Sequence, residues 1–379
     1  MFPGVITKDQ PGYRQCTVTL MDTTDPEIRF NAAGECHYVD DYRNRILPAW
    51  NPDGDPEALS SLFNRIRRDG QGKEYDCLLG LSGGVDSSYL AYLAWKHGLR
   101  PLVVHTDTGW NSELAVKNIE GIVKTCGFDL FTYVVYWPEM QDLQRAFFRA
   151  AVPNQDIPQD HAIFAAFYAQ AGRHGVPWVL SGSNFACESI LPPAWGYDAL
   201  DLRHLKAVHR RFGTQPLRQF PAMGYLRHAL HFRWLQKMKV AKPLNLVRYN
   251  KQEAMDTLTR EFGWRYYGGK HYESRFTKFF QGWYLPTKFG FDKRLAHLSS
   301  LILSGQLTRE AALLELEREH YAPEDLREDL VYMQKKLGVT AEEFDALMAL
   351  PPRRHEDYPS ARVAIRMGRR AVGLLRGQR

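Results

Sequence analysis

Strand-like runs alternate with helical patterns between residues 57 and 246. The runs read "YDCLLGL", "PLVVHTD", "LFTYVVY" and "VPWVLSGS", and helical patterns such as residues 86–97 and 112–126 separate them. Parallel strands need a long crossover between them, which is usually a helix. The alternation therefore predicts an α/β fold, in which a parallel twisted sheet carries helices on both faces.

The chain divides around this region into three expected units. Residues 1–52 are rich in turn formers and predict a small N-terminal module. Residues 53–246 hold the alternating pattern and predict a single α/β domain. Residues 247–379 change to helical patterns around the loop "YYGGKHYESRFTKFFQGWYLPTKFGFDKR", so we expect a helical C-terminal region there.

Composition excludes several classes of protein. With 379 residues, 44% of them hydrophobic and 24% charged, the chain can bury a large core. It contains no apolar run of the roughly 20 residues that a membrane span needs, and "MFPGVITKDQPG" does not resemble a signal peptide. Five cysteines, an odd number, indicate reduced thiols. We therefore expect a cytoplasmic protein that does not bind membranes.

The net charge of +6 leaves the type of partner open. Lys and Arg are spread along the chain, so the charge suits a polyanionic small molecule at least as well as nucleic acid. The closing "RMGRRAVGLLRGQR" is a basic tail, typical of a solvated helix end. Charge alone does not decide between these partners.

A turn of small polar residues follows the first strand of the alternating region, "YDCLLGL". Glycines there allow left-handed backbone angles and a close approach to a ligand, and the helix that begins near Asp86 points its positive end at the same place. Successive N–H groups and serine hydroxyls would hold phosphate oxygens. The candidate phosphate ligands are Ser82, Gly83, Gly84, Asp86, Ser87 and Ser88.

A lone Gly-Gly more often makes a plain turn, and Ser or Asp more often caps a helix. The order of strand, SGGVDS and helix near the start of an alternating domain favours a phosphate site instead, because such sheets bind ligands at the carboxyl ends of their strands. The commoner GxxxxGK[ST] loop is absent from the sequence.

The string SGGVDS resembles the pyrophosphate loop of N-type ATP pyrophosphatases, whose fold is the adenine nucleotide alpha hydrolase-like α/β fold. The resemblance implies that ATP is cut between its α and β phosphates, a substrate oxygen is adenylated, and a nucleophile displaces AMP. It also implies Mg²⁺ as a cofactor, with Asp86 as a metal contact and catalytic residue. The strand ends "VVHTDTGW" and "LSGSN" would hold the nucleoside. The adenine and ribose candidates are Leu81, His105, Thr106, Asp107 and Gly182.

A closer resemblance covers residues 16 to 317. The strings "MDTTDPEIRFNAAGEC", "DHAIFAAFYAQA", "SGSNFACESILPPAW" and "GGKHYESRFTKFFQGWYLPTKFGFDKRLAHLSSLILSGQLTRE" are similar to N-acetyl sugar amidotransferases of the WbpG type, from bacterial O-antigen and surface polysaccharide (lipopolysaccharide) biosynthesis. This resemblance implies that an acetamido group on a nucleotide-linked sugar becomes an acetamidino group. The imidate formed by adenylation is then attacked by ammonia.

The charged loop after residue 266 is the expected sugar-nucleotide site, because it gathers donors among aromatic residues. Lys270 and Arg275 are the preferred catalytic phosphate contacts, and Glu188 is a candidate for a sugar hydroxyl or incoming ammonium. A solvated charged face is the alternative for each single residue. His161, on an apolar helical pattern, reads as a core histidine. The other substrate candidates are His271, Glu273, Lys288, Lys293 and Arg294.

The N-terminal module departs from the pattern that the family resemblance implies. That pattern has two CxxC pairs, which suit tetrahedral zinc. Thr19 and Val39 stand where the second cysteine of each pair would be, so only Cys16 and Cys36 remain as zinc ligands. Two thiolates are too few for structural zinc unless His37, Asp40 or a neighbouring chain completes the site, so we expect no bound zinc. The other cysteines read as structural.

The sequence shows no glutaminase nucleophile. Phe2 occupies position 2, and Cys187 lacks the flanking glycines of a nucleophile elbow. The resemblance implies that ammonia comes from a separate glutaminase with a cyclase-barrel-like partner subunit. Two other functions remain open: an ATP-dependent tRNA-thiolating or lysidine-type enzyme, which would want a basic face, and an inactive nucleotide-binding subunit. The even spread of charge weighs against the tRNA-modifying enzyme, which would need a basic face to bind nucleic acid.

Overall fold

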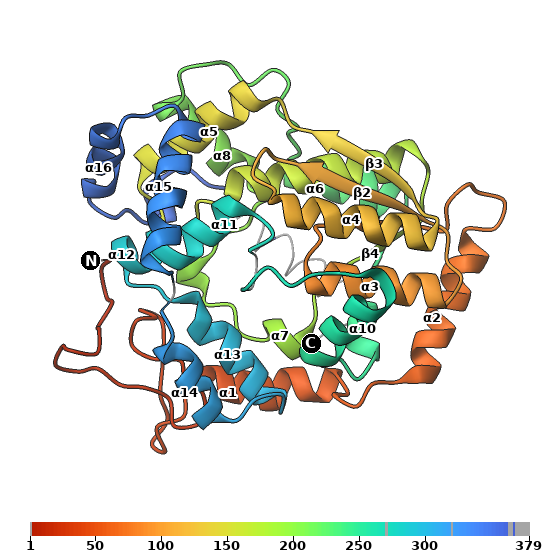
Figure 1. The fold of residues 1–379 in the computed structure, drawn as a ribbon, viewed down its shortest axis with the longest axis horizontal. Coiled ribbons are helices and arrows are strands. Elements are labelled where there is room, and N and C mark those ends of the chain that lie inside the picture. The colour runs from red at the N-terminus through yellow and green to blue at the C-terminus, as the bar shows by residue number, and fades with distance from the viewer. Residues whose placement is uncertain (1, 270–271, 320, 363–366, 368–379) are drawn as a thin grey trace.

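The computed structural model describes residues 2–269, 272–319, 321–362 and 367. Its centre is a five-stranded sheet with strand order β3-β2-β1-β4-β5, and every neighbouring pair is parallel (Figure 1). The expected α/β fold is confirmed. The strands are β1 (Cys77–Gly80), β2 (Pro101–Asp107), β3 (Asp129–Val134), β4 (Trp178–Leu180) and β5 (Lys239–Ala241).

The sheet grows outward from β1 in both directions. The chain runs from β1 to β2 and β3 on one side, then crosses to β4 and β5 on the other side. The strand order therefore reverses between β1 and β4. Loops that leave the carboxyl ends of these two strands diverge and leave a crevice, which is where open α/β sheets bind ligands.

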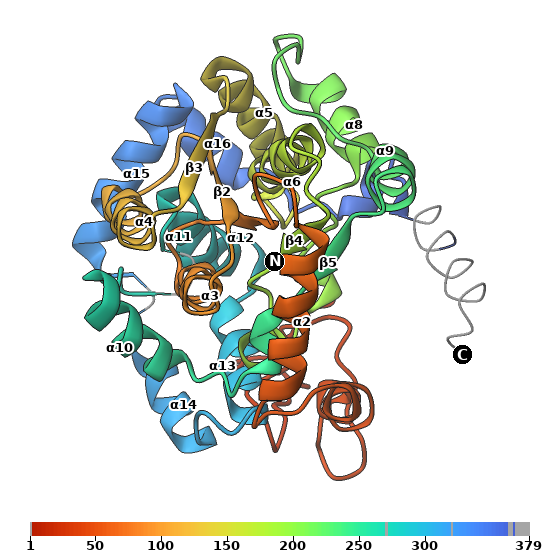
Figure 2. The same cartoon turned by 90° about the vertical axis from the view of Figure 1, so that its right-hand side faces the viewer.

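Helices cover both faces of the sheet because the buried strands are apolar on both sides. Leu79 and Val103 pack toward α2, α3 and α4, whereas Leu78 and Val104 pack toward α6. Figure 2 shows the two helical layers on either side of the strands. The helices of this part are α2 (Pro56–Asp69), α3 (Val85–Lys96), α4 (Glu113–Cys126), α5 (Trp137–Ala150), α6 (Ile157–Arg173), α7 (Phe185–Glu188), α8 (Leu202–Phe212) and α9 (Tyr225–Arg227).

Local sequence signals set the helix ends. The Ser112 hydroxyl accepts a hydrogen bond from Ala115 N (3.2 Å) and caps α4, which ends at Gly127 with a φ of 65°. His161 on α6 is fully buried, with Nδ1 2.5 Å from Ala199 O and Nε2 accepting from Met223 N (3.1 Å). The interpretation of His161 as a core histidine is confirmed.

The C-terminal region is helical, as expected, but it does not form a separate body. Leu258 of α10 lies in the same core cluster as Leu90 of α3, so this helix packs on the α/β domain. None of the helices in the described ranges is long and apolar enough to cross a membrane. The helices are α10 (Lys251–Phe262), α11 (Arg275–Phe279), α12 (Leu285–Phe289), α13 (Lys293–Leu303), α14 (Arg309–Glu317), α15 (Pro323–Leu337) and α16 (Ala341–Ala349).

The N-terminal module, with helix α1 (His37–Asp41), lies against α13 and α14 (Figure 1). Leu20 N donates to Ser299 Oγ (3.0 Å), and the Arg309 guanidinium donates to Cys16 O (3.3 Å). Cys16 and Cys36 share a core cluster with residues of the C-terminal helices. Both ends of the chain therefore contribute to one hydrophobic core.

Lys288 on α12 belongs to this packing. It was expected to contact substrate, but only 6% of its surface is exposed. Its Nζ donates to the carbonyl oxygens of Leu347 (2.9 Å), Met348 (2.8 Å) and Leu350 (2.7 Å). These carbonyls lie at the C-terminal end of α16, where helical donors run out, although Leu347 O also accepts from Leu350 N (3.4 Å). The ammonium group therefore caps a helix, and the structure does not bring it to the candidate site.

We expect Lys288→Met to lower the free energy of unfolding by about 3 kcal/mol, because it leaves three carbonyl groups without their charged donor. Urea denaturation followed by circular dichroism measures this change. Lys335→Met, at an exposed lysine on α15, is the matched control and should change stability by less than about 0.5 kcal/mol. Equal stability of the two variants would contradict the capping role of Lys288.

Candidate active site

The candidate phosphate loop (residues 81–84) joins β1 to α3 at the reversal of strand order. Gly83 has a φ of 81°, and a Cβ there would lie 2.6 Å from Ala115 O. Gly84 N donates to Ser82 Oγ (3.2 Å), and the Ser82 and Ser87 hydroxyls lie 3.1 Å apart. The loop is thus a tight turn that only glycine can complete, with two hydroxyls at the start of a helix.

Ser88 does not belong to this group. Its side chain is fully buried, and within the described ranges its hydroxyl has no hydrogen-bond partner. It is the fourth residue of α3, one helical step beyond Ser87, and it faces the core rather than the loop. The expected contact of Ser88 with phosphate is not supported by its position.

Asp86 lies in the first turn of α3 and is held by two residues from distant parts of the chain. Its Oδ1 accepts hydrogen bonds from Tyr249 Oη and from Asn184 Nδ2 (3.2 Å). Burial and the nearby Asp86 charge raise the pKa of Tyr249 well above its usual value, so the phenol remains a donor. The carboxylate is therefore oriented before any ligand binds.

A segment of the C-terminal region lies across the candidate phosphate loop. Trp264 Nε1 donates to Gly83 O (3.0 Å), and Val85 N donates to Tyr267 Oη (3.2 Å). Glu273 Oε1 lies 3.1 Å from where a Cβ of Gly84 would stand, and Ser112 N donates to Glu273 O (2.9 Å). Glu273, expected at the sugar, thus lies beside the loop itself.

A loop cavity of about 180 Å³ opens at this place. Ser82, Gly84, Asp86 and Ser87 line it on one side, as the sequence predicts for a phosphate site. The residues on its other side come from the loop after β4, from α7 and from the C-terminal region. These residues are Gly182, Ser183, Cys187, Glu188, Lys251, Tyr267, Gly269, Glu273 and His297.

A strand-end cavity of about 420 Å³ adjoins the loop on the β2 side, where the nucleoside is expected. Leu81, His105 and Thr106 line it together with the apolar side chains of Ile163 and Phe167. Most of its other lining residues are polar, among them Asn154, Asp156 and Gln159, so the cavity offers many hydrogen-bonding groups beside one apolar patch. The structure therefore gathers three of the five adenine and ribose candidates.

His105 is fixed in one tautomer by its neighbours. The Asn111 amide nitrogen lies 3.0 Å from His105 Nε2 and 3.1 Å from Asp107 Oδ1, so it donates to both. His105 Nε2 is then the acceptor, and Nδ1–H donates to Leu81 O (3.0 Å). The ring holds the backbone of Leu81 at the carboxyl end of β1.

The other two candidates lie elsewhere. The Asp107 carboxylate accepts from Gly109 N (2.8 Å) and closes the turn after β2. Gly182 lines the loop cavity, where a Cβ would stand 3.4 Å from Ser87 N. Gly182 is thus close to the phosphate loop, and Asp107 supports the site from behind.

A C-terminal cavity of about 610 Å³ lies beyond the loop cavity. Three of the expected substrate residues, Glu188, Lys293 and Arg294, line it together with aromatic side chains such as Trp195 and Tyr272. Arg294 is anchored by Asp292 (2.7 Å) and donates to Arg318 O (2.8 Å). A cavity of this size and lining suits a large polar ligand with an anionic part.

The loop cavity and the C-terminal cavity share one boundary. Five residues line both of them: Cys187, Glu188, Lys251, Gly269 and His297. His297 Nδ1 lies 3.3 Å from Cys187 O, which fixes the ring at this boundary. A group held in the C-terminal cavity can therefore reach the candidate phosphate loop past Glu188, Lys251 and His297.

Sequence reasoning missed several of these residues. Tyr249 and Lys251 lie at or just before the start of α10 with no motif around them. His297 lies within the longest string of the family resemblance but was not singled out there, and only tertiary packing brings these three residues to the site. Asn184 carried a signal, because it ends "LSGSN" at the carboxyl end of β4 next to β1.

Arg275 lies away from the site. Its guanidinium forms an ion pair with Asp329 (2.6 Å) and stacks on the ring of Tyr332 at 3.8 Å. These contacts fasten α11 to α15, so the structure does not support Arg275 as a catalytic phosphate contact. Lys270 and His271, which were also expected at the site, lie outside the described residues.

The thiols of the N-terminal module keep part of a metal-knuckle geometry. Cys36 N donates to Cys16 Sγ (3.2 Å), and Thr19 N lies 3.4 Å from the same sulfur. Thr19 Oγ1 lies 3.6 Å from Cys36 Sγ. Hydrogen bonds from Cys36 and Thr19 lower the pKa of Cys16, whereas this pairing and burial raise the pKa of Cys36. Within the described ranges no group of three metal-ligating side chains is present.

One known protein family matches the C-terminal part of the chain. Residues 273–371 match the family model described as the C-terminal domain of WbpG-like LPS biosynthesis proteins. This segment is therefore similar to the C-terminal domain of WbpG-like proteins. This confirms the resemblance stated from the sequence, whose longest string overlaps the match. The WbpG-like domain supplies α13 and α14, which form one wall of the C-terminal cavity.

Two curated relatives match shorter parts of the chain. A glutamine-hydrolysing GMP synthase from Thermus thermophilus is 26% identical over 171 residues, which is 44% of this chain and 31% of that protein. A tRNA(Ile)-lysidine synthase from Chlamydia pneumoniae is 29% identical over 136 residues, covering 35% of this chain and 40% of that protein. The chain thus spans less than half the length of either relative.

The alignment with a solved structure of NMN synthetase from Francisella tularensis covers 75% of this chain and 94% of the synthetase chain. The superposition has a TM-score of 0.30 and 15% sequence identity.

We expect Gly83→Ala to weaken ATP binding by more than about tenfold, because the Cβ overlaps the Ala115 carbonyl and moves the cradle. Calorimetric titration with a non-hydrolysable ATP analogue measures the affinity. Gly72→Ala is the matched control: its φ is 77°, and a Cβ there meets nothing within 4 Å. It should cost about 1 kcal/mol of stability without loss of binding. Unchanged affinity in Gly83→Ala would count against the loop.

We expect the wild-type chain to carry far less than one zinc ion. The double variant Thr19→Cys, Val39→Cys should bind close to one equivalent, because it restores four thiolates around a knuckle whose N–H to sulfur bonds are already formed. Elemental analysis of both proteins, purified side by side, checks this. A full equivalent of zinc in the wild-type protein would show that other residues replace the missing cysteines.

Proposed function

We propose that this chain is an ATP-dependent N-acetyl sugar amidotransferase, a ligase that forms AMP and an amidine. Its substrate would be a nucleotide-linked acetamido sugar, such as a UDP-2,3-diacetamido uronic acid, of a bacterial surface polysaccharide pathway. The observation that supports this most is the shared boundary between the loop cavity and the C-terminal cavity, because the WbpG-like domain forms a wall of the latter.

The proposed reaction has two steps. The carbonyl oxygen of the acetamido group attacks the α phosphorus of ATP, the bond to the β phosphate breaks, and pyrophosphate leaves. Ammonia then adds to the carbon of the O-adenyl imidate, AMP leaves with the former carbonyl oxygen, and a proton is released. Adenylation is needed because an amide carbonyl is a poor electrophile and its oxygen a poor leaving group.

The chain's own groups would divide these tasks. The Gly84 N–H, the Ser82 and Ser87 hydroxyls and the start of α3 would hold the departing pyrophosphate. The strand-end cavity would hold the nucleoside. Glu188 and His297 lie at the boundary through which the acetamido group would meet ATP, so they would contact the reacting group or the incoming ammonia.

The residues at the candidate phosphate loop are of the types that bind magnesium together with a nucleotide. Mg²⁺ usually takes one or two carboxylates together with phosphate oxygens, so a complete protein cage is not required. Asp86, which Tyr249 and Asn184 orient beside the loop, would be its carboxylate contact. The ion would neutralise the triphosphate and so allow a substrate oxygen to approach.

The ammonia would come from a separate partner. Cys77 is buried at the start of β1, and burial raises the pKa of its thiol. Cys187 is also buried. Neither thiol is exposed as a glutaminase nucleophile must be, and Cys187 also lacks the flanking glycines of a nucleophile elbow. We propose a glutaminase with a cyclase-barrel-like subunit as the source.

The test supplies ATP, magnesium and a UDP-acetamido sugar, with either glutamine or a high concentration of ammonium salt at mildly alkaline pH. We expect the isolated chain to form AMP and amidine with ammonium and not with glutamine. A parallel reaction with bulk tRNA in place of the sugar tests the tRNA-modifying alternative. AMP formation that depends on tRNA would overturn the proposed substrate.

In the same assay we expect Asp86→Asn to lower AMP formation by about a hundredfold or more, because it removes the charge that would bind the metal. The amide oxygen can still accept from Tyr249, so the fold should persist, and a thermal melt checks this. Asp41→Asn is the control, since Asp41 pairs with Arg45 on the surface of the N-terminal module. Full activity of Asp86→Asn would refute the role of Asp86.

A further inference from the structure

An apolar stripe stands on the surface between α8 and β5. It lies on α9 and the π-helical turn that follows, His228–Leu235. Leu226, Leu230 and Trp234 recur at every fourth residue and are 73%, 58% and 72% exposed, and Leu235 is 62% exposed. Soluble proteins seldom expose several large apolar side chains side by side without a binding role.

The other side of this helix is firmly packed. Phe232 is 2% exposed, and its ring centroid lies 5.6 Å from that of Tyr168 on α6. Met238 N donates to Phe232 O (2.9 Å), and Met238 is itself buried. The stripe is therefore turned outward by packing of the opposite face.

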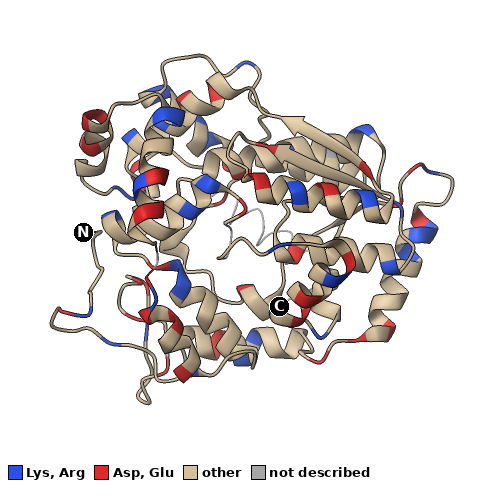
Figure 3. Cartoon of the chain, viewed as in Figure 1, with Lys and Arg blue, Asp and Glu red and all other residues tan. Residues whose placement is uncertain are grey.

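The chain around the stripe carries only positive charge. Residues 202–252 contain no Asp or Glu, whereas both signs are mixed over most other parts of the chain (Figure 3). The expectation of evenly spread charge is wrong for this stretch. Its basic residues are Arg203, Lys206, Arg210, Arg211, Arg218, Arg227, Arg233, Lys237, Lys239, Lys242, Arg248 and Lys251.

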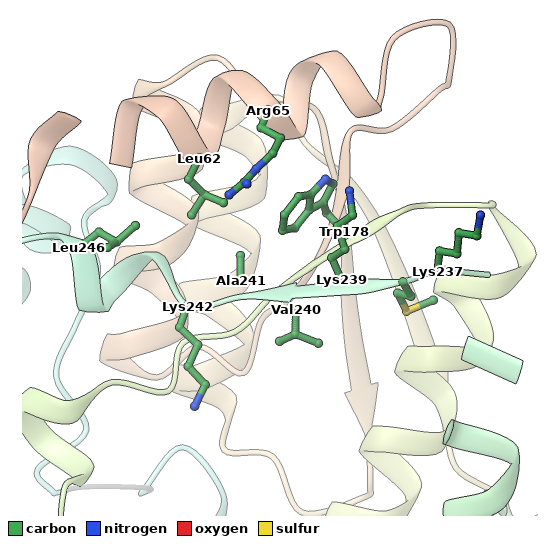
Figure 4. A pocket seen from close by; sticks show the side chains of 10 residues that line it. Leu62, Arg65, Trp178, Lys237, Lys239, Val240, Ala241, Lys242 and Leu246 are labelled. Atoms are coloured by element: carbon green, nitrogen blue, oxygen red, sulfur yellow. The ribbon is translucent and has the colours of Figure 1, made fainter. Parts of the chain in front are cut away.

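A groove of about 590 Å³ continues this surface along the edge strand β5 (Figure 4). Lys237, Lys239 and Lys242 line it together with Arg65 of α2. Lys239 pairs with Asp69 (2.9 Å), which neutralises part of the charge there. Lys237 and Lys242 are exposed, as is Arg227 beside the stripe.

We propose that this basic apolar face, formed by Leu226, Leu230, Trp234 and Leu235 with Arg227 and Lys237, binds the surface of a membrane that contains anionic lipids. A helix lying in the interface places Leu side chains among the acyl chains and Trp at the level of the headgroups. Lys and Arg beside it are attracted to anionic headgroups. The proposal does not depend on the reaction proposed above.

The geometry favours a bilayer over other partners. Side chains that are 58–73% exposed form a ridge, and a bilayer accepts a ridge without a complementary groove. The phosphates of a nucleic acid would pair with the cations, but they would not bury the three leucines. The expectation of no membrane partner rested on spanning segments, whereas a helix that lies on the surface needs none.

The test is flotation of the full chain with vesicles of phosphatidylcholine alone or mixed with phosphatidylglycerol, at low and at physiological salt. We expect binding to the mixed vesicles that weakens with salt, and at least about tenfold weaker binding of the triple variant Leu226→Ser, Leu230→Ser, Trp234→Ser. The control is Leu314→Ser, Val331→Ser, at two residues that are each 64% exposed on α14 and α15. It should bind like the wild type.

Thermal melting shows that each variant is folded, and none of these residues lines the candidate active site. The proposal is overturned if the wild type does not float with anionic vesicles, or if the triple variant binds as well as the control. It is also overturned if the stripe instead mediates self-association, seen by analytical ultracentrifugation, or if the triple variant loses binding to RNA and not to vesicles.

Discussion

The hydrogen bond from Trp264 to the carbonyl of Gly83 fixes how the C-terminal region sits on the α/β domain. Trp264 is 1% exposed, and its acceptor belongs to a turn that only glycine can adopt. Tyr267 and Glu273 follow on the same segment and lie over the start of α3. The candidate site is therefore composite: strand ends supply its floor, and a segment about 180 residues later in the chain supplies its cover.

The sequence predicts what depends on local physics. Hydrophobic alternation and the glycine turn fix the parallel sheet and the loop, because both follow from spacing along a few residues. Ser82, Leu81, His105 and Thr106 lie where expected, since each directly follows or ends a strand whose carboxyl end must face the crevice. The prediction for Ser88 is wrong by one position, because a single step along α3 turns a side chain from the loop into the core.

Charge alone does not tell where a cation will lie. Arg275 finds Asp329 and Tyr332 on α15, and Lys288 finds the last carbonyls of α16. These partners lie 54 to 62 residues away in sequence, and no spacing rule connects them. For the same reason, Tyr249 and Lys251 could not be found beforehand, because they reach the site through the packing of α10 and carry no motif of their own. His297, on α13, lies within a string of the family resemblance, but nothing in that string marks it as a site residue.

The direction of the strands separates the two surfaces that the molecule offers to ligands. All five strands run the same way, so their carboxyl ends meet at the crevice and their amino ends at the opposite edge. The apolar stripe precedes β5 and therefore belongs to the amino-terminal edge, whereas the candidate phosphate loop follows β1 at the carboxyl edge. A membrane bound at the stripe would leave the mouth of the active site facing solution. Nucleotide and sugar nucleotide could then enter from the aqueous side while the protein stays at a lipid surface.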